Sequence, residues 1–339
     1  MTIVNTIVNI KLISNLIIYL KYKMVEGRMY MTNQADLARI FTVAKLYYEE
    51  NLTQAEVAER VGVSRPLVSK MLSEARECGI VHIEVRNVVS GNRKLLQALV
   101  EKFGLVGGLV VPNAKTAAVQ RHNLYEQAGH YLVGETSNQK NLGVGWGTAI
   151  NELMWTLSRQ TVPSVNGTIF PLIGEANIPN KGYHTNEIVT MLANYTGRKA
   201  RLLYAPAFPD NVEERKLYIS SSSFEDLNVL WEKIDAAMVA VYDYPTVPDE
   251  CTSERFGDVL KEKRAVGNLL SYFYDVKGNI IYGKNDCAIH ISLDKLRNSK
   301  KVICFVEKAT PQAVYGALKT GLLTHIILTE QIAEQVLAF

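Results

Sequence analysis

The segment 52–72 constrains the fold of this chain more than any other part of the sequence. Thr53 and Glu56, three residues apart, have the pattern of a capping box, which predicts a short helix beginning at the residue after Thr53. Gly62 then permits a tight turn, because glycine adopts a positive φ at little steric cost. A second helix is expected to start at Ser64. Two short helices joined by a glycine turn are typical of a helix-turn-helix.

The apolar residues of this region recur at helical spacing, so each expected helix has one buried face. In the two short helices this face comprises Val57, Ala58, Val61, Leu67, Val68 and Met71. A preceding helix is expected over residues 35–51 and would pack behind them through Leu37, Ile40, Phe41, Ala44 and Tyr48. The alternating run 80–85 predicts a half-buried strand, comparable to the wing of a winged helix.

In a helix-turn-helix, the second helix enters the major groove of DNA and its first turns contact the base edges. The residues that we expect to contact DNA are Thr53, Gln54, Ser64, Arg65, Ser69 and Lys70. Arginine and serine suit base edges, whereas lysine and the start of the first helix suit phosphates. The alternative is an ordinary helical hairpin packed into a core. Because the formal net charge is only +3, any DNA contact must depend on a local surface.

A chain of 339 residues exceeds one typical domain, and we expect two. Residues 35–88 would form the helix-turn-helix domain and residues 89–339 a second, larger domain. Residues 1–34 are interpreted as a leader, poorly structured and dispensable; a peripheral membrane or oligomer contact is the alternative. The leader is rich in Ile, Leu and Val, but polar residues interrupt it before the ~20 apolar residues of a membrane span are reached. It also lacks the basic start and the cleavage site of a signal peptide.

Composition and residue spacing give no indication of a metal or cofactor. Hydrophobic residues make up 47% of the chain and charged residues 21%, which allows a sizeable core and argues against general disorder. The four cysteines lie far apart without C-x-x-C spacing, and the six histidines form no H-x-x-x-H pair. We therefore expect no metal, no cofactor and free thiols in a reducing cytoplasm.

Beyond residue 107, short apolar runs alternate with helical stretches. The runs are Leu109–Val111, Asn141–Val144, Thr168–Ile173, Ala236–Val241, Lys301–Val306 and His325–Leu328. Such alternation predicts a parallel sheet covered by helices, an α/β domain. Ligands of these sheets bind at the carboxyl ends of the strands, so we expect the binding residues in the loops that follow these runs.

A glycine-rich motif follows the second of these runs and opens a helix. Its residues are Gly143, Gly145, Trp146, Gly147 and Thr148. Glycines allow a ligand to approach the backbone, and the start of a helix favours an anion or a hydroxyl-rich group. The alternative is that the glycines only allow a strand and a helix to pack closely. There is no Walker pattern and no convincing acidic residue for a dinucleotide ribose.

Taken together, the helix-turn-helix, the glycine-rich motif and several other segments resemble the SorC family of sugar-binding transcriptional regulators. The resemblance covers residues 35–338. The matching segments are 46–56 (LYYEENLTQAE), 143–149 (GVGWGTA), 264–268 (RAVGN), 273–275 (FYD) with Gly278, 317–321 (ALKTG) and 328–330 (LTE). The resemblance implies a DNA-binding domain and a sugar-binding effector domain, residues 89–339, that is Rossmann-like and similar to sugar-phosphate isomerases. It also implies a homodimer or homotetramer.

In such regulators the glycine-rich loop cradles a sugar or sugar phosphate. Tyr183, His184 and Asn186 resemble a Tyr-His-x-Asn segment of the sorbose-regulator branch, and their hydroxyl, imidazole and amide groups suit a polyol. Family members often have an acidic residue where this chain has Asn268. They also often have a phosphate-binding lysine where this chain has Thr310, with Lys308 as a substitute two residues earlier.

The main hypothesis is a transcription regulator whose DNA affinity changes when a sugar, polyol or sugar phosphate binds. The alternative is a sugar-phosphate isomerase or deaminase with an accessory helical domain. Enzymatic chemistry needs an acid and a base close to the same carbon. No compact acid–base group surrounds the glycine-rich motif, and an asparagine at position 268 cannot transfer a proton. Asp275 is acidic, but before Lys277 and Gly278 it is expected to shape a turn.

Overall fold

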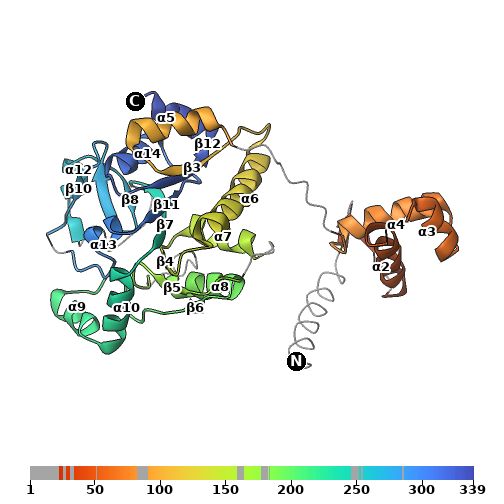
Figure 1. The fold of residues 1–339 in the computed structure, drawn as a ribbon, viewed down its shortest axis with the longest axis horizontal. Coiled ribbons are helices and arrows are strands. Elements are labelled where there is room, and N and C mark those ends of the chain that lie inside the picture. The colour runs from red at the N-terminus through yellow and green to blue at the C-terminus, as the bar shows by residue number, and fades with distance from the viewer. Residues whose placement is uncertain are drawn as a thin grey trace. The chain divides into compact units, whose positions relative to one another are not determined.

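A computed structural model of the chain describes residues 23–25, 28–30, 34–50, 52–81, 91–158, 164–176, 182, 184–245, 252, 255–284 and 286–339. The chain divides into two compact units, Met1–Val88 and Val89–Phe339 (Figure 1). Most of the expected leader, residues 82–85 of the expected strand and Tyr183 lie outside the described residues.

The described part of the first unit is mainly helical. It contains α2 (Gln34–Tyr48), α3 (Gln54–Val61) and α4 (Arg65–Glu77), preceded by the antiparallel strands β1 (Lys23–Val25) and β2 (Arg28–Tyr30). The two strands fall in the segment for which the sequence predicts little structure.

The start of α3 is fixed by hydrogen bonds that the sequence predicts. The Thr53 N–H donates to Glu56 Oε2 at 2.7 Å, and the Glu56 N–H donates to Thr53 Oγ1 at 3.3 Å, so the capping box is confirmed. Gly62 ends the helix in the left-handed conformation with φ 71°, where side chains are rarely tolerated. The predicted glycine turn between the two short helices is therefore confirmed.

Packing between the helices of this unit differs from the predicted faces at two positions. The core comprises Ile40, Val43, Ala44, Leu46, Val57, Ala58, Val68, Met71, Leu72 and Ala75. Phe41 is 57% exposed and Leu67 is 39% exposed, so the prediction that both are buried is wrong. Each is at the edge of its apolar stripe, and the buried stripe of α4 runs through Val68, Met71 and Leu72 instead.

The second unit is built on one sheet, of ten strands in the described residues. Seven of these are parallel: β3 (Gly107–Val111), β4 (Asn141–Val144), β5 (Thr168–Pro171), β6 (Lys199–Ala200), β7 (Ala236–Asp243), β11 (Lys301–Phe305) and β12 (His325–Thr329). All six predicted runs are confirmed as strands. Their spatial order is β6-β5-β4-β7-β11-β12, with β3 added beside β12, which is the order of a doubly wound sheet.

Three antiparallel strands that the sequence did not predict extend this sheet: β8 (Ala265–Leu269), β9 (Tyr272–Asp275) and β10 (Ile280–Ile281). β7 is long enough to pair twice along one edge. Residues 236–238 pair with β4, and residues 241–243 pair with β8. β8 therefore continues the sheet beyond the point where β4 ends.

Helices cover both faces of the sheet (Figure 1). They are α5 (Arg93–Phe103), α6 (Ala117–Thr136), α7 (Thr148–Leu157), α8 (Thr185–Thr196), α9 (Val212–Ile219), α10 (Ser222–Glu232), α12 (Val259–Glu262), α13 (Leu293–Arg297), α14 (Pro311–Lys319) and α15 (Glu330–Leu337). α6, α7 and α8 share one hydrophobic core with the sheet, and α5, α10, α13, α14 and α15 share another. The helix predicted at Lys94–Phe103 thus packs within this unit.

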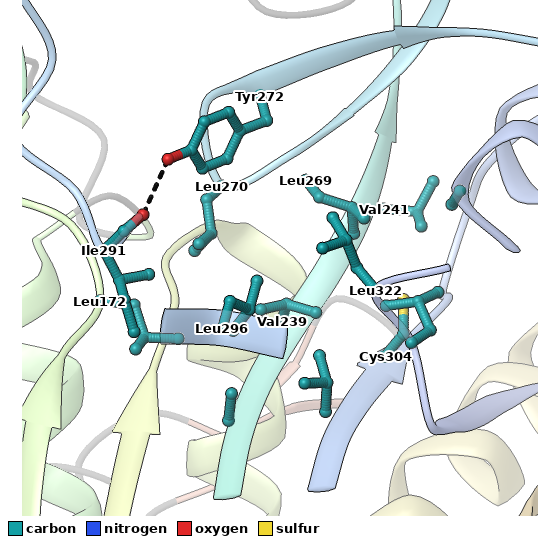
Figure 2. Packing of buried hydrophobic residues seen from close by; sticks show 14 of the residues in the cluster. Leu172, Val239, Val241, Leu269, Leu270, Tyr272, Ile291, Leu296, Cys304 and Leu322 are labelled. Atoms are coloured by element: carbon teal, nitrogen blue, oxygen red, sulfur yellow. Dashed lines mark hydrogen bonds between the residues drawn. The ribbon is translucent and has the colours of Figure 1, made fainter. Parts of the chain in front are cut away.

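Figure 2 shows part of the second core, where the sheet and its antiparallel extension meet. Val241 of β7 pairs with Leu269 of β8, and Val239 of β7 belongs to the same core. Tyr272 donates its hydroxyl hydrogen to the carbonyl of Ile291 at 2.8 Å. This hydrogen bond satisfies a buried phenol hydroxyl, and leaving that hydroxyl without a partner would lower the free energy of unfolding. β8 and β9 are thus held to the segment that precedes α13.

Candidate functional site

The glycine-rich motif lies where the strand order of the sheet reverses. β4 has β5 on one side and β7 on the other, and the chain leaves β4 through Gly145 and enters α7 at Thr148. Sheets of this order bind ligands outside the carboxyl ends of the strands at this reversal. The topology therefore makes the end of β4 the candidate site.

The glycines of the motif make room for protein side chains. A Cβ on Gly143 would overlap Leu172 and come within 2.8 Å of Ile234 Cδ1, and one on Gly145 would lie 2.9 Å from Leu270 Cδ2. These distances are too short for a methyl group. These two glycines are therefore explained by close packing against side chains next to the strands, not by the strand–helix packing considered from the sequence.

Gly147 is required for a different reason. Its φ of 113° and ψ of 158° are open almost only to glycine, and a Cβ there would overlap the Tyr242 hydroxyl and lie 2.8 Å from Tyr242 Cε2. Tyr242, near the end of β7, thus packs directly against the backbone that starts α7. The Gly147 N–H donates to the carbonyl of Gly182 at 2.6 Å, which fixes the loop from the other side.

Trp146 anchors the loop through its side chain. The indole is buried, packs edge-on against Phe208 with ring centroids 5.6 Å apart, and donates its Nε1 hydrogen to the carbonyl of Leu270 at 3.0 Å. Leu270 lies between β8 and β9, so the indole ties the end of β4 to the antiparallel extension. The structure therefore gives the Trp146 side chain a role in positioning the loop.

The start of α7 differs from the neighbouring helix starts. The N-cap residue of α7 is Gly147, which has no side chain to cap the helix, and Thr148 is exposed. By contrast, Glu175 accepts hydrogen bonds from Thr185 N at 2.7 Å and Asn186 N at 3.0 Å at the start of α8. Backbone N–H groups at a helix start favour hydroxyl oxygens or anions, so α7 can bind such a group.

Asn268 is brought to the same side of the sheet. It pairs directly with Tyr242 across the antiparallel strands β7 and β8, and directly paired residues have their side chains on the same face. The side chain is buried, with 4% of the residue exposed. Tyr242 therefore connects Asn268 with the start of α7.

Thr310 and Lys308 are placed differently. The Thr310 N–H and hydroxyl both donate to Asp243 Oδ1, at 2.7 and 2.8 Å, and its hydroxyl oxygen accepts from Ala313 N at 3.3 Å to cap α14. Lys308 is exposed just beyond the end of β11. Tyr242 and Asp243 are successive residues at the end of β7, so their side chains lie on opposite faces of the sheet. Asp243 contacts the start of α14, and Tyr242 contacts the start of α7.

His184 and Asn186 lie at the start of α8. His184 is its N-cap residue and is half-buried. The Asn186 side chain bonds Leu203 twice, donating to the carbonyl and accepting from the N–H, both at 3.0 Å. Asn186 therefore joins α8 to the loop after β6.

A charged group beside α7 was not identified from the sequence. Arg121 of α6 forms a bidentate ion pair with Glu152 of α7, and its Nε donates to Glu307 at 2.6 Å. These contacts, with Glu152 first, raise the pKa of Arg121. The guanidinium also lies 4.9 Å from the ring centre of Tyr125, whose pKa is raised by burial. The three charged residues are at least thirty positions apart, so no local motif predicts them.

The residues expected to contact DNA are displayed on the surface of the first unit. Thr53, Ser64, Arg65, Ser69 and Lys70 are exposed and Gln54 is half-buried. Arg65 begins α4, and Lys70 lies 3.8 Å from Glu74 on the same helix. Pro66 in the first turn suits a helix start. The exposed side of α4 is thus cationic at its N-terminal end, opposite its buried stripe.

Asp275 is confirmed as a turn residue. Its carboxylate accepts hydrogen bonds from Lys277 N and Asn279 N, each at 2.9 Å, and its pKa lies below the ordinary value although burial alone would raise it. In the described part of the chain, no cluster of His, Cys, Asp and Glu has the arrangement of a metal site. No described helix combines the length and apolar character that crossing a bilayer requires.

Comparison with known proteins places the chain among regulators. A family model described as "Putative sugar-binding domain" matches residues 87–338. The sorbitol operon regulator of Klebsiella pneumoniae is 27% identical over 91% of this chain and 100% of its own length. The deoxyribonucleoside regulator of Bacillus subtilis is 28% identical over 85% of this chain and 93% of its own length.

A solved structure agrees with these sequences. The crystal structure of the full-length sorbitol operon regulator SorC from Klebsiella pneumoniae superposes with a TM-score of 0.70 at 26% identity, covering 90% of this chain and 100% of that one. The shared architecture extends over nearly the whole chain, and the family model covers the α/β unit. The chain therefore belongs to the SorC family of sugar-binding transcriptional regulators.

Proposed function

We propose that the protein is a DNA-binding transcription regulator of carbohydrate metabolism genes whose DNA affinity is set by a bound sugar, polyol or sugar phosphate. The relatives are named as operon or deoxyribonucleoside regulators, which supports this class of function. Two regions of the molecule support this proposal: the cationic start of α4 and the end of β4.

In this proposal α3 and α4 form a helix-turn-helix, and residues 35–88 are the DNA-binding domain. The observation that carries it is that α4 buries Val68 and Met71 while exposing Arg65, Ser69 and Lys70. An exposed face with these side chains suits insertion into the major groove. Thr53, Gln54 and Ser64 would contact phosphates or base edges from the two helix starts.

The effector would bind in the second unit, residues 89–339, at the start of α7. Thr148 would offer its hydroxyl and backbone N–H, and Asn268 its amide, both on the side of the sheet that Tyr242 lines. A mixture of donors and acceptors suits vicinal hydroxyl groups. Gly143, Gly145, Gly147 and Trp146 would act by fixing the backbone. Tyr183, His184, Lys308 and Thr310 remain candidate rim residues.

Regulation requires that the effector bind the DNA-competent and DNA-incompetent states with different affinities. A difference of ~1–3 kcal/mol is enough for such coupling. A homodimer or homotetramer would present two recognition helices to two half-sites of an operator. An isomerase or deaminase is disfavoured, because the candidate site has an amide at Asn268 and an arginine–carboxylate ion pair instead of an acid–base pair.

The test is DNA selection followed by a substitution. Duplexes selected from a random library by the full chain should share a sequence, and Arg65→Ala should weaken binding to it about tenfold or more, because one arginine–guanine contact discriminates by about 1–3 kcal/mol. Arg76→Ala, on the last turn of the same helix, is the matched control and should bind normally. Selection of no common sequence, or equal loss in both variants, would refute the assignment of α4.

A further inference from the structure

We propose that the site at the end of β4 takes an uncharged polyhydroxy effector, a free sugar or polyol, in preference to its phosphate ester. The inference rests on the proposed function and adds the chemical class of the ligand. A phosphate ester carries nearly two negative charges at neutral pH, so its binding needs cationic side chains or helix starts that no anion already occupies. Among the described residues around the site, the start of α7 and the exposed Lys308 meet this requirement, but four carboxylates oppose a phosphate there.

Two helix starts at this edge of the sheet already hold an anion of the chain itself. Glu175 accepts from the N–H groups of Thr185 and Asn186 at α8, and Asp243 accepts from the N–H and hydroxyl of Thr310 at α14. The positive end of each helix dipole is therefore compensated internally. A phosphate at either place would have to displace a carboxylate that the fold holds in position.

The charge of Arg121, whose guanidinium pairs with Glu152 of α7, is also compensated. Arg121 bonds Glu152 through both terminal nitrogens and Glu307 through Nε, so three of its donors meet carboxylates. Two carboxylates and one guanidinium leave this group with a net charge of −1, and Glu307 is the less exposed carboxylate, with 12% of its side chain accessible. An approaching phosphate would meet this negative charge at short range.

The threonine at position 310, where family members often have a lysine, also disfavours a phosphate. A lysine there would add a cation beside Asp243. Thr310 is neutral, and its N–H and hydroxyl both donate hydrogen bonds to the Asp243 carboxylate. Around the site, the four carboxylates of Glu152, Glu307, Asp243 and Glu175 outnumber the two cations, Arg121 and Lys308. Carboxylates accept hydrogen bonds from sugar hydroxyls but repel phosphate, so the arrangement favours a neutral ligand.

The first experiment compares matched pairs on the full chain by calorimetry: sorbitol with sorbitol 6-phosphate, fructose with fructose 6-phosphate, and deoxyribose with its 5-phosphate. Tighter binding of a free sugar or polyol than of its own ester supports the inference. An ester that binds as tightly as its parent, or more tightly, overturns it and leaves a sugar-responsive regulator intact. Binding of none of these compounds overturns both the inference and the proposed effector site.

The second experiment uses inorganic phosphate alone, so it does not depend on which carbohydrate is the effector. Glu307→Gln should bind phosphate on the order of tenfold more tightly than the wild type, because it removes one charge next to Arg121 without changing the shape of the side chain. Glu213→Gln, an exposed carboxylate on α9, is the charge-matched control and should bind as the wild type does. A wild type that already binds phosphate as well as Glu307→Gln, or a variant without any gain, overturns the inference.

Discussion

Replacing Gly147 by alanine tests whether the start of α7 is the binding element. The backbone there has φ 113° and ψ 158°, a region that costs a residue with a Cβ about 1–3 kcal/mol. The new methyl would also overlap the Tyr242 hydroxyl and lie 2.8 Å from Cε2, and such overpacking typically costs about 1–3 kcal/mol. We expect the variant to be destabilised by about 2–6 kcal/mol in total.

The same displacement should weaken effector binding. If the ligand loses one or two hydrogen bonds to the start of α7, at about 0.5–1.5 kcal/mol each, its affinity should fall roughly two- to 150-fold. Urea unfolding of the full chain measures the stability, and calorimetry with the tightest-binding sugar or polyol measures the affinity. Gly134→Ala in α6 is the control, since a Cβ there meets nothing within 4 Å, and it should stabilise by about 0.5–1 kcal/mol.

A double substitution separates the two causes. Tyr242→Ala removes the overlap but not the backbone strain, so Gly147→Ala should be less harmful in its presence than alone. If Gly147→Ala leaves both the unfolding midpoint and the affinity at wild-type values, then the close packing of Tyr242 on this loop has no energetic consequence. The reasoning that places the effector at α7 would then fail.

Two further predictions concern stability. Thr53→Ala removes the N-cap of α3 and should destabilise the unit Met1–Val88 by about 1 kcal/mol, seen as faster amide hydrogen exchange in α3 with unchanged exchange in α7; uniform exchange would contradict it. Burial lowers the pKa of His290 to about 4, with Arg255 and Arg215 acting in the same direction and Asp286 opposing them. In the unfolded chain the imidazole titrates near ~6.5. The contribution of His290 to the free energy of unfolding is therefore complete above that pH, and about 3 kcal/mol of it is lost as the pH falls toward 4. His290→Gln should flatten the wild-type difference between urea midpoints at pH 7 and pH 4.5, and an unchanged slope would contradict the assignment.

Local sequence patterns predict the structure correctly where a few neighbouring residues determine it. The capping box of Thr53 and Glu56 and the left-handed Gly62 depend on contacts within three to five residues, and both are confirmed. The burial of Phe41 and Leu67 was predicted wrongly, because a residue at the edge of an apolar stripe is buried or exposed according to the crossing of α2 and α4. Periodicity alone does not determine that crossing.

The parallel strands could be predicted because both of their faces are covered by helices, so they are continuous apolar runs. β8 and β9 were missed for the opposite reason. β8 includes Gly267 and Asn268, and its pairing with β7 depends on β4 ending after Val144, a fact of tertiary structure. The ion pairs of Arg121 were missed because they join α6, α7 and the end of β11, which no sequence spacing relates.

In the proposed function, the glycine-rich motif provides the binding element without specifying its ligand. Gly143, Gly145 and Gly147 are each required by a protein side chain that occupies the space of a Cβ, and this requirement is the same for any effector. Discrimination must then come from residues that can change without disturbing the loop. Glu307 and Thr310 are such residues, since both lie beyond the strand ends and contribute charge or its absence. We therefore expect charge substitutions around this fixed backbone to change the preference between a neutral sugar and its phosphate. Glycine substitutions are expected to weaken the binding of both ligands, because they alter the backbone that either ligand would contact.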